Sequence, residues 1–444
     1  MICVSHAINE EQLKKFQYQF HSQKVNEVLA NTVQNNGINQ VAQSLTVETQ
    51  LDPTFSIEVK TGAVSNQKQS GRCWLFAALT TLRTKFATEY QTKDFELSQN
   101  YLSFYDRLEK ANWFYQQVIA TASLPLEDRK VAHLLANPDD DGGQWSYAVN
   151  LIKKYGVVPK YVMPETYNSE HTNEFSTILK TKLRKDAIEL RHMVNEGSHH
   201  TDLDKIVETK MADIYRICVY AFGQPPKQFK LELRNDNHNL IQERSITPQE
   251  FAQKYCAFPL DDFVGILNAP QPSKEFGQTY CLEGNGNMVG AQQAKDLNLP
   301  IERLQQLAIK QLQAGETVWF GNDVLEQLNR KKGLLASELY DYNHLFNIDL
   351  NMDKGERLDF AQGQMSHAMV LTGVDLDENG QPLKWKVENS WGDKIGTKGY
   401  FVMSNQWFKD YVYEVIINKE YLTDAERAQF NQEPIVLPPW DAIG

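Results

Sequence analysis

Apolar residues recur at helical spacing through the first third of the chain. Residues 8–35 combine such a stripe with many polar positions, which predicts an amphipathic N-terminal segment. Apolar positions from 73 to about 90 cover a broad face and predict a largely buried helix. A second helix is predicted from about 98 to 120. Its aromatic side chains are assigned to the core or to an interface: Tyr101, Phe104, Tyr105, Trp113, Phe114 and Tyr115.

The pattern changes between about residues 166 and 300. Two charged helical stretches, 177–196 and 202–220, precede sequence that is rich in Pro, Gly and Asn. We therefore predict an insertion that is helical first and irregular later. After about residue 315, short apolar runs alternate with turn residues, as strands do. The predicted strands are 317–320, 368–372, 384–387, 400–403 and 412–417.

Helices followed by an antiparallel sheet predict an α+β fold with two lobes. We divide the chain into an N-terminal extension, a helical lobe, the insertion, a β lobe and a C-terminal arm. The two lobes together form one catalytic domain. The predicted ranges are 1–60, 61–165, 166–300, 301–418 and 419–444, in that order.

Composition and charge narrow the possible partners. The 444 residues are 41% hydrophobic and carry a formal net charge of −12, without a dense stripe of Lys and Arg. Nucleic acid is therefore not an expected partner. The N-terminus turns polar by His6, and no apolar run approaches the length of a membrane span. We expect a cytoplasmic protein that does not bind membranes.

The cysteines are scattered and odd in number, and no pair has C-x-x-C spacing. This distribution argues against a zinc knuckle and against a disulfide framework. Apart from Cys73, we expect buried free thiols in a reducing compartment: Cys3, Cys218, Cys256 and Cys281. No carboxylate cluster has metal-ligand spacing, and the Gly-rich run 284–290 lacks the ending of a phosphate loop. Neither a metal nor a cofactor is expected.

Cys73 opens a predicted helix in the run Gln67 to Trp74. The unpaired N–H groups and the positive end of the helix dipole stabilise a thiolate at that position. Gln67 lies six residues upstream, across a loop that contains glycine. Its side-chain amide can join the Cys73 backbone N–H in holding an oxyanion, where one donor is worth roughly 3–4 kcal/mol. In isolation, a cysteine at a helix start is more often an inert core thiol.

Two segments of the predicted β lobe supply partners for such a thiol. His367 opens an apolar strand, where a base is sheltered yet faces a cleft. Asn389 ends another strand and can accept from one imidazole nitrogen, leaving the other nitrogen for the thiol. Trp391 can shield that hydrogen bond from water. Each residue alone is more often structural, so the interpretation depends on their combination.

Together these segments resemble the papain-like cysteine peptidases. The resemblance is carried by Gln67 before Cys73-Trp74, by His367-Ala368, and by the Asn-Ser-Trp-Gly run that starts at Asn389. It implies that Cys73 is the nucleophile, His367 the base and acid, Asn389 its orienter and Gln67 the oxyanion residue. It also implies a helical lobe and an antiparallel β-barrel lobe. Gly142 and Gly143 resemble the loop whose backbone pairs with extended substrate, with Gly143 making the contact.

Departures from the common pattern point to one group within that family. Ser70 and Arg72 stand before the nucleophile where the common signature has Cys and Ser or Ala, so that family's disulfide is absent. The long insertion separates Cys73 from His367. These features resemble the bleomycin hydrolase/aminopeptidase C group over nearly the whole chain. That resemblance implies a barrel-like homohexamer held together partly by the insertion.

The resemblance also implies a role for the C-terminal arm. Its prolines keep residues 433–444 extended. In the group the arm lies in the substrate cleft, where the carboxylate of Gly444 can pair with the free α-amine of a peptide. Some relatives are endopeptidases instead, and the position of the arm decides between the two. The alternative interpretation is a frayed terminus.

We therefore expect a cysteine aminopeptidase that hydrolyses peptides from the N-terminus through a thioester acyl-enzyme. Three alternatives remain at this point. The first is an endopeptidase of the same subfamily, the second a Cys-His acyltransferase, and the third a hexamer with a vestigial site and a structural or nucleic-acid-binding role. The sequence does not indicate a side-chain preference or the peptides that the protein meets in the cell.

Overall fold

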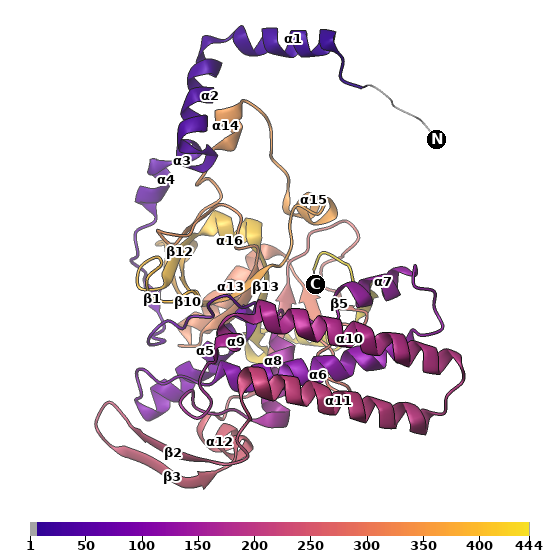
Figure 1. Cartoon of the computed structure of the whole chain (residues 1–444). Coiled ribbons are helices and arrows are strands. Elements are labelled where there is room, and N and C mark those ends of the chain that lie inside the picture. Colours follow the sequence, from indigo (N-terminus) through magenta and orange to yellow (C-terminus); the bar gives the residue numbers. More distant parts are fainter. Residues whose placement is uncertain (1–6, 444) are drawn as a thin grey trace.

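The computed structural model describes residues 7–443. A helical lobe packs against a β lobe, and an N-terminal arm projects from the body of the molecule (Figure 1). Residues 1–6, including Cys3, and Gly444 lie outside the described part. Within that part, no helix is long and apolar enough to cross a bilayer.

The helical lobe is built around three helices, α5 (Cys73–Tyr90), α6 (Gln99–Ala120) and α8 (Trp145–Tyr155). The sequence predicted the first of these from residue 73 to 90 and the second to within one residue. Ser98 caps α6 because its hydroxyl accepts from the N–H of Tyr101 at 3.0 Å. The α6 aromatics contribute heavily to the core, as predicted; Tyr101, Phe104, Phe114 and Tyr115 are buried.

Two long helices from the predicted insertion extend this lobe. They are α10 (Thr172–Asn195) and α11 (His200–Phe222), and both lie along α6 (Figure 1). Apolar residues of α10 at helical spacing, such as Phe175, Leu179 and Leu183, are buried against the same core. Shorter helices complete this part of the chain: α7 (Arg129–Ala136) and α9 (Tyr167–Glu170).

The prediction that the later part of the insertion is irregular is wrong. A hairpin of β2 (Phe229–Arg234) and β3 (Leu240–Ile246) precedes α12 (Pro248–Tyr255) and a 3-10 turn, Leu260–Asp262. Three short strands then join the main sheet. The sequence did not predict these strands because they are short and lie between connections rich in Pro and Gly. This holds even for β4, which is apolar and wholly buried. The strands are β4 (Phe263–Leu267), β5 (Thr279–Leu282) and β6 (Asp296–Asn298).

The β lobe is a twelve-stranded mixed sheet. Besides β4, β5 and β6, its strands are β1 (Ile57–Glu58), β7 (Val318–Asn322), β8 (Leu328–Asn329), β9 (Leu334–Leu335), β10 (His367–Leu376), β11 (Pro382–Glu388), β12 (Tyr400–Ser404), β13 (Val412–Asn418) and β14 (Ile435–Leu437). The central strands are antiparallel neighbours, as predicted, whereas the pairs β4–β6, β5–β14 and β9–β12 are parallel. The five predicted strands correspond to β7, β10, β11, β12 and β13.

Helices cover this sheet and fill its connections. The helix α13 (Ile301–Gln313) packs on the sheet through Leu304, Leu307 and Leu312, which are buried with residues of β7, β10 and β13. Smaller helices lie nearby: α14 (Tyr342–Phe346), α15 (Lys354–Asp359), α16 (Asn405–Tyr411), the 3-10 turn Lys419–Tyr421 and α17 (Asp424–Phe430).

The N-terminal arm consists of α1 (Glu10–His21) and α2 (Lys24–Asn36). The sequence predicted one amphipathic segment, and the structure divides it at Ser22 and Gln23. Neither helix has a buried residue, so their apolar stripe faces away from the chain's own core. The short helices α3 (Ile38–Ala42) and α4 (Leu45–Gln50) and the strand β1 (Ile57–Glu58), which pairs with β10, connect the arm to the body.

Candidate active site

Cys73 is the first residue of α5, so the free N–H groups of that helix start surround its thiol. The residue is partly exposed and its thiol is free. Burial raises the pKa of the thiol, whereas the backbone N–H groups of Ala368, Trp74 and Cys73 itself act to lower it. Because Ala368 follows His367 on β10, the thiol of the helical lobe lies against the strand that carries the predicted base.

His367 begins β10 and is 7% exposed. Its Nε2 lies 3.0 Å from Oδ1 of Asn389, the residue that follows β11. Burial lowers the pKa of His367 to about 4, with Asn389 acting in the opposite direction and the charge of Arg330 adding to the decrease. Since Asn389 engages Nε2, the other ring nitrogen is left for the thiol.

Asn389 is fixed by a second contact and sheltered by an aromatic ring. Its Oδ1 also accepts the N–H of Ser390 at 2.7 Å, which orients the amide toward the imidazole. The ring of Trp391 lies 5.1 Å from the ring of His367, and the Arg330 guanidinium covers Trp391 at 4.4 Å. The hydrogen bond between His367 and Asn389 is therefore shielded from water, as the sequence predicted for Trp391.

Burial favours the uncharged form of both reactive groups when each is considered alone. A proton that passes from the Cys73 thiol to His367 would create both charges together, so that their attraction would offset part of the cost of burial. The helix N-terminus and the Ala368 N–H stabilise the thiolate side of that pair. This arrangement can produce a nucleophile without an external base.

Gln67 lies beside Ser390, the residue that follows Asn389. Its Nε2 donates to the backbone oxygen of Ser70 at 2.5 Å, and its Oε1 accepts the hydroxyl of Ser390. The Gln67 N–H also donates to the Ser390 carbonyl at 2.8 Å. These contacts fix the orientation of the amide and leave its second hydrogen without a partner among the described residues.

Ser390 stands inside the Asn-Ser-Trp-Gly run but had no predicted role. It connects Gln67 to Asn389, because its N–H donates to Oδ1 of Asn389 and its hydroxyl donates to Oε1 of Gln67. The side chain is buried. A serine directly after Asn389 was the available signal, but its partner is 323 positions away.

The loop with Gly142 and Gly143 borders Trp74, the residue after the nucleophile. A Cβ on Gly143 would lie 2.6 Å from the Trp74 ring, so this position requires glycine. Trp74 Nε1 donates to the Asp141 carbonyl at 2.8 Å, and the Gly71 N–H donates to the Asp141 side chain at 2.9 Å. The predicted substrate loop is thus attached directly to the start of α5.

The C-terminal arm is docked on the body up to Ile443. Strand β14 (Ile435–Leu437) pairs with β5, and the Trp440 ring lies 3.9 Å from the Arg129 guanidinium. Asp441 forms an ion pair with the buried Lys274 at 3.1 Å, and Ile443 is itself buried. The interpretation of the arm as a frayed terminus is wrong for residues 435–443. The predicted contact of Gly444 falls outside the described residues.

The candidate site contains a thiol (Cys73), an imidazole (His367) and two side-chain amides (Gln67 and Asn389). Across residues 7–443, no group of three or more His, Cys, Asp or Glu side chains is arranged to hold a metal ion. Cys218, Cys256 and Cys281 are buried free thiols, as predicted.

The comparisons with known proteins agree with this geometry. The model of a family described as "Peptidase C1-like family" matches residues 7–444. The chain belongs to this family. Aminopeptidase C of Lactobacillus helveticus is 44% identical over 440 residues, which cover 98% of each chain. Aminopeptidase G of Lactobacillus delbrueckii subsp. lactis is 45% identical over 440 residues, 99% of this chain and 100% of that relative.

Solved structures extend the similarity to the fold. The crystal structure of PepW from Lactobacillus rhamnosis HN001 matches with a TM-score of 0.98 and 48% identity, covering 99% of both chains. Membership of the Peptidase C1-like family and the α+β papain-like fold are thereby confirmed. The predicted class of enzyme, a cysteine peptidase of the aminopeptidase C group, is confirmed as well. The acyltransferase and the vestigial hexamer are not favoured by these relatives.

Proposed function

We propose that this chain removes residues from the N-terminus of peptides, with Cys73 as nucleophile and His367 as its base. One observation carries the proposal. The Cys73 thiol, at the start of α5, faces the N–H of Ala368, beside a His367 whose Nε2 is 3.0 Å from Asn389. Two lobes thus supply the two halves of a thiol–imidazole pair.

In the proposed reaction, Nδ1 of His367 takes the thiol proton while Sγ of Cys73 attacks the peptide carbonyl. The oxyanion is held by the Cys73 N–H and by Nε2 of Gln67. The imidazolium then protonates the leaving amine, and the C–N bond breaks to give a thioester. Water, deprotonated by His367, attacks the thioester and releases the acid and the thiol.

The arm supports cleavage that starts at the peptide N-terminus. It is anchored by β14, Trp440 and Asp441, and its last described residue, Ile443, is buried. We place the Gly444 carboxylate opposite the α-amine of the substrate, as the resemblance to the group implies. An endopeptidase would need the arm to stand clear of the cleft.

Substitution of the nucleophile tests the chemical part of this proposal. Cys73→Ala is expected to abolish peptide hydrolysis while the protein remains folded, because the thiol contributes little packing. Iodoacetamide should label native Cys73 at pH 6 much faster than an ordinary thiol, because the neighbouring imidazole promotes thiolate formation. Full activity of Cys73→Ala would contradict the assignment.

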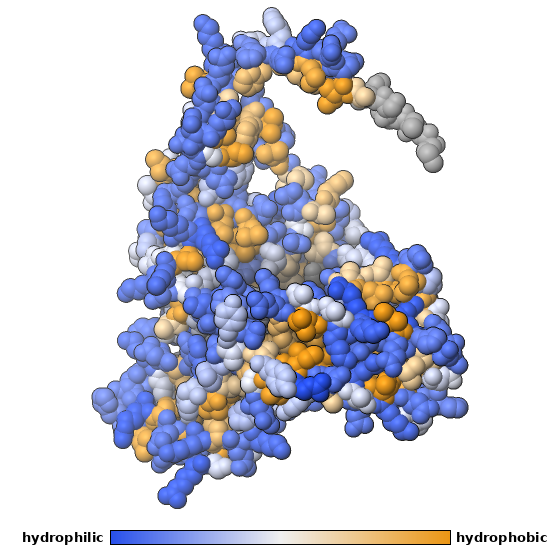
Figure 2. Space-filling view, viewed as in Figure 1, coloured by the Kyte–Doolittle hydropathy of each residue, from blue (hydrophilic) through white to orange (hydrophobic). Residues whose placement is uncertain are grey.

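We also propose that the chain forms a homohexamer, in which the N-terminal arm contacts a neighbouring subunit. Among the described residues, no side chain of α1 or α2 is buried, and Figure 2 shows apolar side chains along this arm. Isolated helices of 12 and 13 residues are marginal in water, so contact with another subunit would stabilise them.

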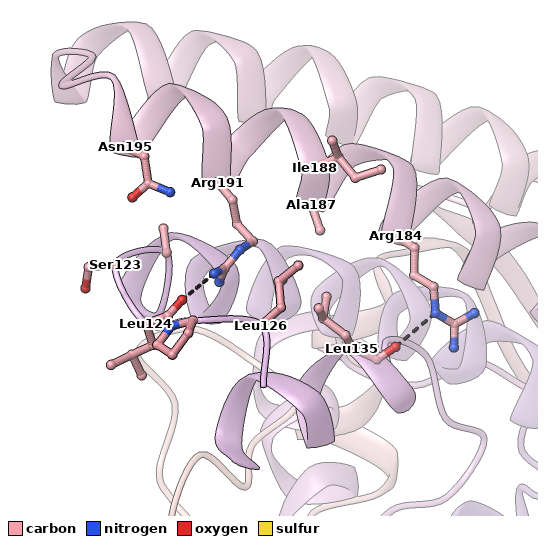
Figure 3. A pocket seen from close by; sticks show the side chains of 11 residues that line it. Ser123, Leu124, Leu126, Leu135, Arg184, Ala187, Ile188, Arg191 and Asn195 are labelled. Carbon is pink, nitrogen blue, oxygen red and sulfur yellow. Dashed lines mark hydrogen bonds between the residues drawn. The ribbon is translucent and has the colours of Figure 1, made fainter. Parts of the chain in front are cut away.

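A groove on the helical lobe offers a surface for such a contact (Figure 3). It has a volume of about 750 Å³ and lies between the end of α6, α7 and α10. Leu126 and Ile188 line it and are 59% and 66% exposed. Arg184 and Arg191 also line it and donate to the carbonyls of Leu135 and Leu124, respectively. The predicted insertion thus supplies one wall, consistent with its proposed role in assembly.

The proposed location is the reducing cytoplasm. Ser70 stands where the family signature has its disulfide cysteine, and the described cysteines are free. A thiol nucleophile also stays active only where it is kept reduced.

A further inference from the structure

A buried ion pair joins the helix that carries Cys73 to the strand that ends before Asn389. Arg83 lies on α5, and Glu388 is the last residue of β11. Nη2 of Arg83 is 2.7 Å from Oε1 of Glu388, and the two side chains are 3% and 2% exposed. The partners are 305 positions apart, so the contact crosses from one lobe to the other.

The same two side chains also hold the chain segment that precedes α5. Arg83 donates to the backbone oxygen of Ala63 at 2.7 Å and to the hydroxyl of Ser65 at 3.3 Å. The second carboxylate oxygen of Glu388 accepts the hydroxyl of Thr61. Both charges therefore have hydrogen-bonding partners, as buried charges require.

The held segment leads directly to the oxyanion residue. Ser65 accepts the N–H of Gly392 at 3.0 Å, and the Gln67 N–H donates to the Ser390 carbonyl at 2.8 Å. Residues 61–67 and 388–392 therefore run side by side from the ion pair to the site. Movement at Glu388 would be transmitted to Asn389 through one peptide bond and to Gln67 through this pairing.

We propose that Arg83 and Glu388 are positioning residues that set how closely the Cys73 thiol approaches His367. The inference rests on the proposed roles of Cys73 and His367. Because the thiol and the base belong to different lobes, the distance between them depends on the relative position of the two lobes. Apolar contacts between the lobes have no preferred direction, whereas charge-assisted hydrogen bonds fix length and direction. A misplacement of about 1 Å at a reacting centre costs roughly a hundredfold in rate.

The double variant Arg83→Met/Glu388→Leu tests the proposal, because it removes both charges and leaves neither one buried alone. We expect kcat to fall by about ten- to a hundredfold while KM changes by less than about twofold. The pH profile of Cys73 alkylation by iodoacetamide should also shift upward, since a more distant imidazole stabilises the thiolate less. Unchanged kcat together with an unchanged alkylation profile would overturn the proposal.

A second ion pair, which joins the β lobe to the first helix of the C-terminal arm, provides the control. Nε of Arg303 on α13 lies 2.6 Å from Oε1 of Glu426 on α17, and neither residue contacts a predicted site residue. Arg303→Met/Glu426→Leu is expected to leave kcat and the alkylation profile unchanged. If the Arg83 double variant does not fold, Arg83→Lys decides the matter. Lysine keeps the charge but loses the planar fork, so kcat and the profile should still shift, and wild-type behaviour would overturn the proposal.

The activity of Cys73→Ala shows whether a failed test concerns the proposed function or only the role of Arg83 and Glu388. If Cys73→Ala keeps activity, the nucleophile itself is wrongly assigned. If Cys73→Ala is inactive while the double variant behaves as wild type, only the role of Arg83 and Glu388 is overturned.

Discussion

Burial opposes a charge on either reactive residue by itself. It lowers the pKa of His367 to about 4 and raises the pKa of the Cys73 thiol. Asn389 fixes the imidazole through Nε2 and thereby decides which nitrogen meets the thiol. The contacts of Asn389 thus set the orientation of the imidazole.

Ser390 offers a prediction at this scale. In Ser390→Ala, the Gln67 amide loses the hydroxyl that holds its Oε1. We expect kcat to fall roughly tenfold with KM nearly unchanged, because a loosened donor still reaches the oxyanion part of the time. Steady-state kinetics on a peptide substrate measure both quantities. Ser366→Ala is the control, since its hydroxyl contacts Asp323 and not Gln67. A loss confined to KM would contradict this role for Ser390.

Much of the site could be predicted from the sequence because its residues stand in short runs with fixed spacing. The structure joins Gln67 to Ser390 and His367 to Asn389, and it places the Cys73 thiol against the N–H of Ala368. Ser390 and Arg83 could not be recognised in the same way. Their roles depend on partners more than 300 positions away, and such pairing is visible only after the lobes have docked.

At the scale of elements, long helices with clear periodicity were predictable to within a few residues. The helix α5 needs no polar face because both lobes cover it, and its broad apolar pattern indicated this. The short strands β4, β5 and β6 were missed because runs of three to five residues between turns carry little periodicity. They are strands because the edge of the main sheet supplies their hydrogen bonds.

The N-terminal arm gives the prediction at this scale. Phe16 lies on the apolar stripe of α1 and is 51% exposed in the single chain. Phe16→Ser should weaken assembly, lowering the mass from that of a hexamer, while the fold of each subunit is kept. Native mass spectrometry or light scattering measures the mass. Tyr18→Ser, on another face of the same helix and 77% exposed, should leave the mass unchanged. A monomeric wild-type protein would contradict the proposed hexamer.

At the scale of the whole molecule, the site depends on segments from every part of the chain. The helical lobe supplies Cys73, the β lobe supplies His367 and Asn389, and the C-terminal arm is fixed to the body through Asp441 on Lys274 and Trp440 on Arg129. In the proposed function, the two lobes together form the nucleophile, and the arm selects peptides that have a free N-terminus.

The most direct test of a cysteine aminopeptidase compares two forms of one fluorogenic aminoacyl substrate under reducing conditions. One form has a free α-amine and the other is acetylated, so that they differ only in the charge that the arm carboxylate would bind. We expect hydrolysis of the free form to be at least about a hundredfold faster, since a buried charge pair is lost in the acetylated form. Equal or faster cleavage of the acetylated form, with internal cuts in longer peptides, would contradict the account and indicate an endopeptidase.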